Sequence, residues 1–190
     1  GLILASSGLF AFYLASAERH ASDLKTHFDE FVFSVFVLVY AVCFTGFLPL
    51  IRLGNGGLYW LIGFLLIVWS NDTGAYFAGK KWGSRKLYPL ISPKKTVEGA
   101  LGGLVAGFVV LLLFKFIVFR ELGVVGVFVT SLFVGAVSQI GDFCESFLKR
   151  AYGVKDTSRI LPGHGGILDR FDGVLFSAPV MYLCTKVFGG

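Results

Sequence analysis

The amino-acid sequence predicts an all-α fold, a polytopic transmembrane helix bundle with about six spans. Hydrophobic residues make up 55% of the 190 positions and charged residues 15%, against roughly 25% charged in soluble domains. Several apolar runs approach the ~20 residues that cross a bilayer as a helix. Lys and Arg gather between alternate runs. Together these observations exclude an ordinary soluble domain.

Six apolar segments are the predicted spans. They cover residues 2–17, 31–51, 58–77, 97–119, 122–140 and 173–187. The first is short, and the chain opens without Met or a basic leader, so we expect the interior of a longer protein. The fifth should continue as a helix beyond the membrane through Lys149. No Ser/Gly-rich linker interrupts the chain, which favours one bundle.

The cations are distributed unevenly among the connections. Most of the 17 Lys and Arg residues lie in the first, third and fifth loops. By the positive-inside rule, these loops face the cytoplasm and both chain ends face the opposite side. The third and fifth loops hold more cations than orientation requires, so we expect them to share an anionic ligand.

Small residues form a stripe in the fourth span. Gly99, Gly103 and Gly107 follow one another at intervals of four residues. This spacing lets two membrane helices approach closely. The stripe therefore predicts a tightly packed helix pair.

A polar stripe marks the end of the fifth span. Gln139, Asp142, Glu145, Ser146 and Lys149 follow helical spacing and share one face. Ordinary solvation of a helix leaving the bilayer is the alternative interpretation. Asp142 weighs against it, because it lies where the apolar run ends and a carboxylate at that depth faces a cavity or a cation.

A second acidic cluster opens the sixth span. Asp169 and Asp172 are one helical turn apart, after a glycine-rich turn that contains His164. Carboxylate oxygens together with substrate phosphates are the ligands Mg²⁺ takes. Complementing the helix dipole is the alternative, and it explains one Asp but not the whole set. We expect His164 to shape the loop or bind within it rather than act as a base.

A third group of polar residues includes Asp72, inside the third span. Its burial in a bilayer costs about 2.5–3.5 kcal/mol, so it should face the bundle interior, paired or near a metal. In the loop that follows, Lys94 and Lys95 are suited to phosphate, and Thr96 is expected to cap the next helix. Glu98 either binds a ligand or pairs with these lysines.

The charged segment resembles a known family. The matching positions are Ser146, Lys149-Arg150, Lys155-Asp156, Pro162, His164-Gly165-Gly166, Asp169-Arg170 and Asp172. They have the spacing of the phosphatidate cytidylyltransferase (CDP-diacylglycerol synthase) signature. Asn71-Asp72 and residues 92–98 also resemble segments of this family. The resemblance implies transfer of CMP from CTP to phosphatidate, giving CDP-diacylglycerol and pyrophosphate in phospholipid biosynthesis, with Mg²⁺ and room for a second metal or a monovalent cation.

The resemblance also implies roles for individual residues. Asp142 and Asp169 are the expected metal ligands, with Asp72 a further candidate, and Lys149 and Arg150 join the two aspartates as catalytic residues. The remaining candidates are expected to bind substrate; they are Asn71, Asp72, Lys94, Lys95, Thr96, Glu98, Gln139, Ser146, Lys155, Asp156, His164, Arg170 and Asp172.

The expected organisation follows from the same likeness. Residues 1–57 would form N-terminal membrane spans, and the short first span is consistent with a truncated one. Residues 58–190 would form a catalytic membrane domain that contains the signature segment 139–172. The expected partners are CTP, phosphatidate in the bilayer and a second copy of the chain, without nucleic acid. The expected location is a bacterial inner membrane, with the active site facing the cytoplasm.

Two other functions stay open from the residues alone. A related CTP-dependent enzyme could act on an ether lipid or a polyprenol. A transporter or channel could line an ion path with Asp72 and Asp142, although the cations cluster in loops and no inverted repeat is evident. A purely structural subunit would not need the charged segment 146–172.

Overall fold

The computed structural model describes residues 8, 11–13, 24–40, 45–119, 122–153 and 168–189. The chain divides into two compact units, Gly1–Gly46 and Phe47–Gly190. The first unit contains α2 (Leu24–Val39). Within it, the hydroxyl groups of Tyr13 and Ser34 share a hydrogen bond of 3.0 Å. The candidate site lies in the second unit.

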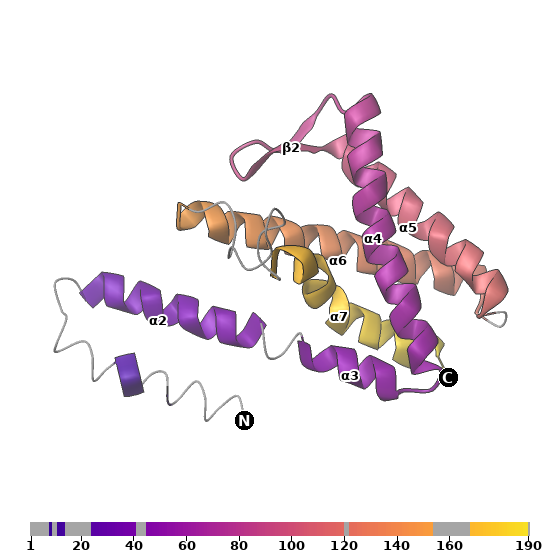
Figure 1. The fold of residues 1–190 in the computed structure, drawn as a ribbon, viewed down its shortest axis with the longest axis horizontal. Coiled ribbons are helices and arrows are strands. Elements are labelled where there is room, and N and C mark those ends of the chain that lie inside the picture. The colour runs from indigo at the N-terminus through magenta and orange to yellow at the C-terminus, as the bar shows by residue number, and fades with distance from the viewer. Residues whose placement is uncertain are drawn as a thin grey trace. The chain divides into compact units, whose positions relative to one another are not determined.

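The second unit is mainly helical (Figure 1). Its elements are α3 (Thr45–Leu53), α4 (Gly57–Trp82), β1 (Lys86–Tyr88), β2 (Ser92–Thr96), α5 (Val97–Ile117), α6 (Val124–Ala151) and α7 (Leu168–Phe188). Within the described ranges, α4, α5, α6 and most of α7 are long and apolar enough to cross a membrane. The predicted helical fold is thus confirmed, and four of the predicted spans correspond to helices that could cross a membrane. As predicted, α6 continues past Lys149.

The other two predicted spans lie partly or mostly outside the described residues. Of the 2–17 span, the structure describes only four residues. Of the 31–51 span, the structure describes the end of α2 up to Val39, Tyr40, and α3 from Thr45 on; residues 41–44 lie outside the described ranges.

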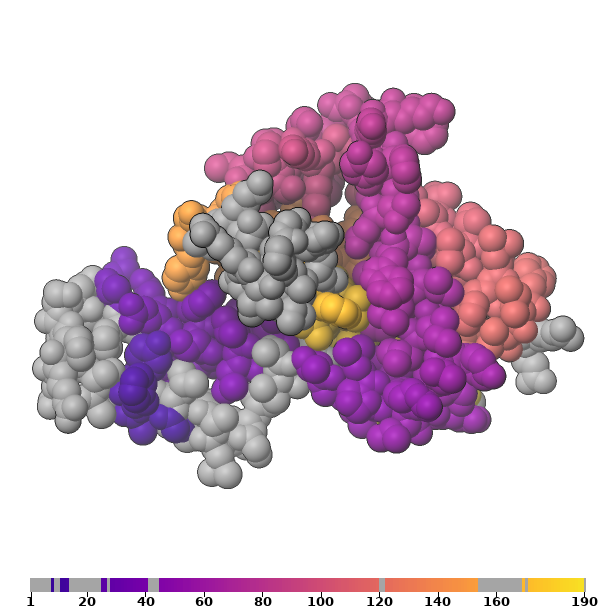
Figure 2. Space-filling view, in the orientation of Figure 1, coloured from indigo at the N-terminus to yellow at the C-terminus, as the bar shows by residue number. Residues whose placement is uncertain are grey.

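A β-hairpin in the third loop departs from the all-α prediction. Strands β1 and β2 are antiparallel, with Lys86 opposite Thr96 and Tyr88 opposite Ser92. The turn begins at Tyr88, whose carbonyl accepts from the Ile91 N–H at 3.2 Å. Pro89 holds the second turn position, where its fixed φ is favourable. The hairpin therefore forms around its turn, and its two strands are too short to show alternating apolar and polar residues in the sequence. Figure 2 shows the hairpin extending from the end of α4.

The predicted glycine stripe packs α5 against α4. Gly99, Gly103 and Gly107 are all buried. A Cβ atom on Gly103 would lie 2.6 Å from the carbonyl oxygen of Asn71, and one on Gly99 would lie 2.9 Å from that of Ala75. No side chain fits in these gaps, so the two backbones approach as closely as the stripe predicts.

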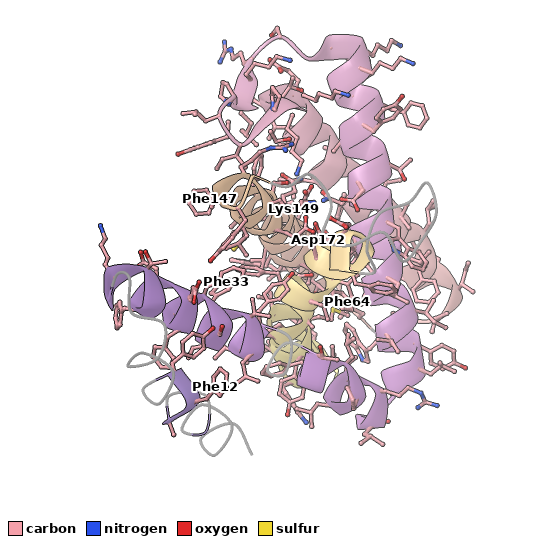
Figure 3. All side chains as sticks on the ribbon, turned by 60° about the vertical axis from the view of Figure 1, so that its left-hand side comes forward. Phe12, Phe33, Phe64, Phe147, Lys149 and Asp172 are labelled. Atoms are coloured by element: carbon pink, nitrogen blue, oxygen red, sulfur yellow. The ribbon has the colours of Figure 1, made fainter. Side chains whose placement is uncertain are left out.

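The apolar core lies between these helices. Phe64 and Ile67 from α4, Leu111 from α5, Val134 from α6 and Met181 from α7 have no exposed surface. Figure 3 labels Phe64 in this core. The core holds the four helices together and so places the polar ends of α4, α6 and α7 relative to one another.

Candidate active site

A pocket of about 400 Å³ lies between α4, the hairpin, α5 and α6. Figure 2 shows the hairpin overhanging the region between the ends of these helices. Apolar atoms, including those of Tyr76 and Phe143, form much of its wall. Its polar lining residues are Asp72, Lys80, Lys94, Lys95, Thr96, Gln139 and Asp142. The pocket therefore joins candidates from the third span, the third loop and the fifth span.

An ion pair connects the hairpin to α6 across this pocket. The ammonium of Lys95 contacts the carboxylate of Asp142, and both side chains are about one-third exposed. The same ammonium lies 4.3 Å from the centroid of the Phe143 ring, in a cation–π contact. The Ser146 hydroxyl lies 3.5 Å from the second oxygen of Asp142. Residues far apart in sequence thus form one charged cluster.

Two more carboxylates belong to this cluster. The charge of Asp72 on α4 interacts with those of Asp142 on α6, Asp172 on α7 and Lys95. Asp172 interacts in turn with Asp142. Three helices therefore bring three carboxylates together with Lys95, and the charge of Lys149 also acts on Asp172. Asp72, which was predicted to face the bundle interior, is an exposed residue that lines the pocket.

A second ion cluster joins α6 to α7. The Lys149 ammonium lies 2.5 Å from a Glu145 carboxylate oxygen and 2.7 Å from one of Asp169. Glu145 is buried, with 4% of its side chain exposed. Figure 3 shows Lys149 and Asp172 at the neighbouring ends of α6 and α7. Glu145 belongs to the predicted polar stripe but had no assigned role, although its position four residues before Lys149 indicates an ion pair.

A buried hydrogen-bond network lies beside the pocket. The Gln139 side-chain amide donates to Asn71 Oδ1 at 2.9 Å and to the Ala100 carbonyl at 3.0 Å. Asn71 donates in turn to the Ser138 hydroxyl at 3.3 Å and has no exposed surface. The network links α4, α5 and α6 next to Asp72 and the pocket. Asn71, which was expected to bind substrate, makes its described side-chain hydrogen bonds to Ser138 and Gln139 of α6.

The base of the hairpin is held by Thr96 and Glu98. The Thr96 hydroxyl accepts from the Gly99 N–H at 3.1 Å, so the predicted helix cap is confirmed. The Glu98 carboxylate accepts from the Ser84 hydroxyl at 2.7 Å and from the backbone N–H groups of Ser84 and Arg85. Glu98 thus braces the chain before β1, and its described hydrogen bonds go to these residues rather than to lysines.

Some of the remaining candidate residues lie in the described part of the chain and others lie outside it. Lys94 lines the pocket, and Arg150 lies in the last turn of α6. Arg170 lies in the first turn of α7. Lys155, Asp156 and His164 lie outside the described residues. The two expected metal ligands belong to separate ion clusters, since Asp142 contacts Lys95 and Asp169 contacts Lys149.

The donor set of the first cluster fits a hard cation. Within the described ranges, no three His, Cys, Asp or Glu side chains are arranged to hold a metal ion by themselves. Mg²⁺ does not require such a cage, because it binds through one or two carboxylates together with substrate phosphates and water. Asp72, Asp142 and Asp172 offer carboxylate oxygens close to a pocket that lysines line. This chemistry suits a cation that arrives with phosphates.

Comparison with known proteins gives a consistent result. The sequence pattern of the cytidylyltransferase family matches residues 3–188. The chain is 43% identical over 162 residues to a protein of Bacillus subtilis (strain 168) named phosphatidate cytidylyltransferase, covering 85% of this chain and 60% of that protein. Proteins of the same name from Staphylococcus haemolyticus (strain JCSC1435) and Staphylococcus aureus (strain COL) are 43% and 45% identical over 136 residues, covering 72% of this chain and 52% of theirs. The chain thus spans about half to three fifths of these curated relatives.

Proposed function

This chain belongs to the cytidylyltransferase family, and we propose that the protein transfers CMP from CTP to phosphatidate. The products are CDP-diacylglycerol and pyrophosphate. Relatives with this name support the proposal. The observation that carries it is the pocket, where lysines from the hairpin and carboxylates from membrane helices meet.

The position of the pocket suits one soluble and one lipid substrate. Lys80, Lys94 and Lys95 line it and offer charge to a triphosphate. The pocket adjoins helices apolar enough to cross a bilayer. A lipid could therefore keep its acyl chains in the membrane while its phosphate reaches the polar end of α6.

The chemistry requires positioning and charge neutralisation. An oxygen of the phosphatidate phosphate attacks the α-phosphorus of CTP in line, and pyrophosphate leaves with the electrons of the broken P–O bond. A phosphate monoester is already ionised near neutral pH, so no residue has to remove its proton. The chain's task is to hold both phosphates in line and to offset their repulsion with fixed cations.

Two groups of residues carry these tasks in the proposal. Asp142 and Asp169, with Asp72 as a further candidate, would hold Mg²⁺, which would supply Lewis-acid neutralisation of the phosphate oxygens. Lys149 is oriented by Glu145 and Asp169 between α6 and α7. This orientation favours a fixed rather than a mobile cation for the reacting phosphates. Arg150, Lys155, Asp156, His164 and Arg170 complete the proposed substrate contacts through the resemblance.

We further propose that the site faces the cytoplasm of a bacterial cell. The lysines of the hairpin and the basic end of α6 belong to the cation-rich loops, which the positive-inside rule assigns to the cytoplasm. CTP is a cytoplasmic metabolite, so this orientation gives the pocket access to its substrate.

The test is a direct assay of the full-length protein. CTP labelled at the α-phosphate, phosphatidate and Mg²⁺ should give labelled CDP-diacylglycerol. Asp142→Asn and Asp169→Asn should each abolish the product while the protein stays folded. Lys186→Gln, in the last turn of α7, is the control that should stay active. Wild-type turnover in either aspartate variant would remove the metal assignment.

A second arm tests the alternatives. Replacing phosphatidate with ether-lipid phosphates or polyprenyl phosphates distinguishes related CTP-dependent enzymes. No product with any lipid phosphate would refute the proposal and favour ion transport.

A further inference from the structure

Lys95 and Asp142 were expected to contact different ligands, a phosphate and a metal ion. In the structure they contact each other. Both line the pocket, together with Phe143, whose ring supports the Lys95 ammonium at 4.3 Å. An oxygen occupied by an ammonium is not available to a divalent cation. The two cations therefore compete for the Asp142 carboxylate, because the same negative charge attracts both of them.

The backbone of Lys95 is firmly placed. The next residue, Thr96, pairs with Lys86 in the hairpin and caps α5 through the Gly99 N–H. The Val97 N–H donates to the Arg85 carbonyl at 2.9 Å. The Glu98 carboxylate accepts from the Ser84 hydroxyl and so holds the chain just before β1. Any exchange at Asp142 is therefore a movement of the Lys95 side chain, whose four-carbon stem permits it.

The surrounding charges explain why a cation stays beside Asp142. The charges of Asp72 and Asp172 both act on Asp142 and repel its carboxylate. Without a positive partner, three carboxylates so placed repel one another. Lys95 reduces this repulsion. A divalent cation would do so with a larger charge.

We propose that Lys95 is the resident cation of Asp142, and that a divalent metal ion arriving with a nucleoside triphosphate displaces it onto the phosphates. This inference rests on the proposed function. Metal and phosphates enter together, so the released ammonium exchanges one anionic partner for another within the same pocket. The Phe143 ring keeps it at the pocket wall during the exchange. In the absence of the nucleotide, Lys95 thus opposes the binding of a metal ion to these carboxylates.

The exchange predicts effects of opposite sign in one variant. Without nucleotide, Lys95→Gln should tighten Mn²⁺ binding to the full-length protein by about fivefold, since the competing ion pair is gone. With saturating Mn²⁺ and no phosphatidate, the same variant should weaken CTP binding by roughly tenfold or more, because a charged donor to phosphate is lost. Electron paramagnetic resonance of free Mn²⁺ measures the first effect, and equilibrium dialysis of CTP the second.

Matched variants separate exchange from a general charge effect. Lys80→Gln removes the same charge from the same pocket, but its ammonium lies over the Tyr76 ring, so Mn²⁺ affinity should change less than about twofold. Lys95→Arg keeps a cation for Asp142 and should bind Mn²⁺ like the wild type. In Lys95→Gln combined with Asp142→Asn, the gain in Mn²⁺ affinity should disappear.

The outcomes distinguish this inference from the proposed function. If the wild type forms CDP-diacylglycerol but Lys95→Gln binds Mn²⁺ no more tightly than Lys80→Gln, the exchange is wrong and the function stands. If Lys95→Gln weakens both Mn²⁺ and CTP binding, Lys95 only supports the structure of the pocket. If the wild type forms no product although Mn²⁺ binding tightens as stated, the function fails and the exchange stands.

Discussion

Replacing Gly103 by Ala tests whether the α4–α5 contact positions the site. The new Cβ would lie 2.6 Å from the Asn71 carbonyl oxygen and 2.7 Å from its Oδ1. Ordinary contact needs at least 3.4 Å, so the helices must separate by 0.8 Å or the Asn71 side chain must turn. Asn71 Oδ1 accepts the Gln139 hydrogen bond, so either response disturbs the buried network.

The expected cost combines two opposing effects. Overpacking of a well-packed interior costs about 1–3 kcal/mol. Alanine gains about 0.8–1.0 kcal/mol over glycine in a helix interior. We therefore expect a net loss of up to about 2 kcal/mol in the free energy of unfolding. Activity should fall as well, because Gln139 lines the pocket.

Gly107→Ala is the matched control, one turn further along α5. Its Cβ would meet Ile67 at 3.4 Å and 3.5 Å, which is ordinary van der Waals contact. It should leave stability unchanged or raise it by up to about 1 kcal/mol. Thermal unfolding of the purified full-length protein in detergent measures both variants. If Gly103→Ala were as stable and as active as Gly107→Ala, the close approach of α4 and α5 would be refuted.

Three further predictions concern the ion cluster, the hairpin and the orientation. Lys149→Met should destabilise the protein by about 3–5 kcal/mol by leaving buried carboxylates uncompensated, and adding Glu145→Gln should restore part of this; an unchanged unfolding midpoint for Lys149→Met would contradict the cluster. Thr96→Ala should cost about 1 kcal/mol through loss of the α5 cap while Thr96→Ser costs less, and equal unfolding midpoints would argue against the cap. A cysteine introduced at Tyr88, which is 54% exposed, should react with an impermeant thiol reagent only from the cytoplasmic side, and labelling only from outside would overturn the topology.

Local patterns predicted the parts of this molecule that depend on local interactions. The apolar runs predicted the positions of α4, α5, α6 and α7. A helix in a membrane must satisfy its own backbone hydrogen bonds and present a continuous apolar surface, and both needs are visible in the local sequence. The glycine spacing predicted the face of α5 that packs closely. The polar residues at the end of α6 shared a face, as their spacing indicated, and Thr96 capped α5 as its position suggested.

These local patterns did not predict contacts between segments that are distant in the sequence. Lys95 and Asp142 are 47 residues apart, and no periodicity relates a loop lysine to a particular carboxylate. The hairpin escaped prediction because a turn and the Glu98 brace form it, rather than alternating strands. The burial of Glu145 was not predicted, because a buried acid and a solvated one look alike in sequence.

One assay addresses the central claim, that the pocket between the hairpin and α6 carries CMP transfer to a lipid phosphate. The full-length protein in phosphatidate-containing micelles receives α-labelled CTP and Mg²⁺, beside its Asp142→Asn and Lys186→Gln variants. The account predicts labelled CDP-diacylglycerol from the wild type and Lys186→Gln, and none from Asp142→Asn. Equal product from Asp142→Asn and the wild type would contradict it.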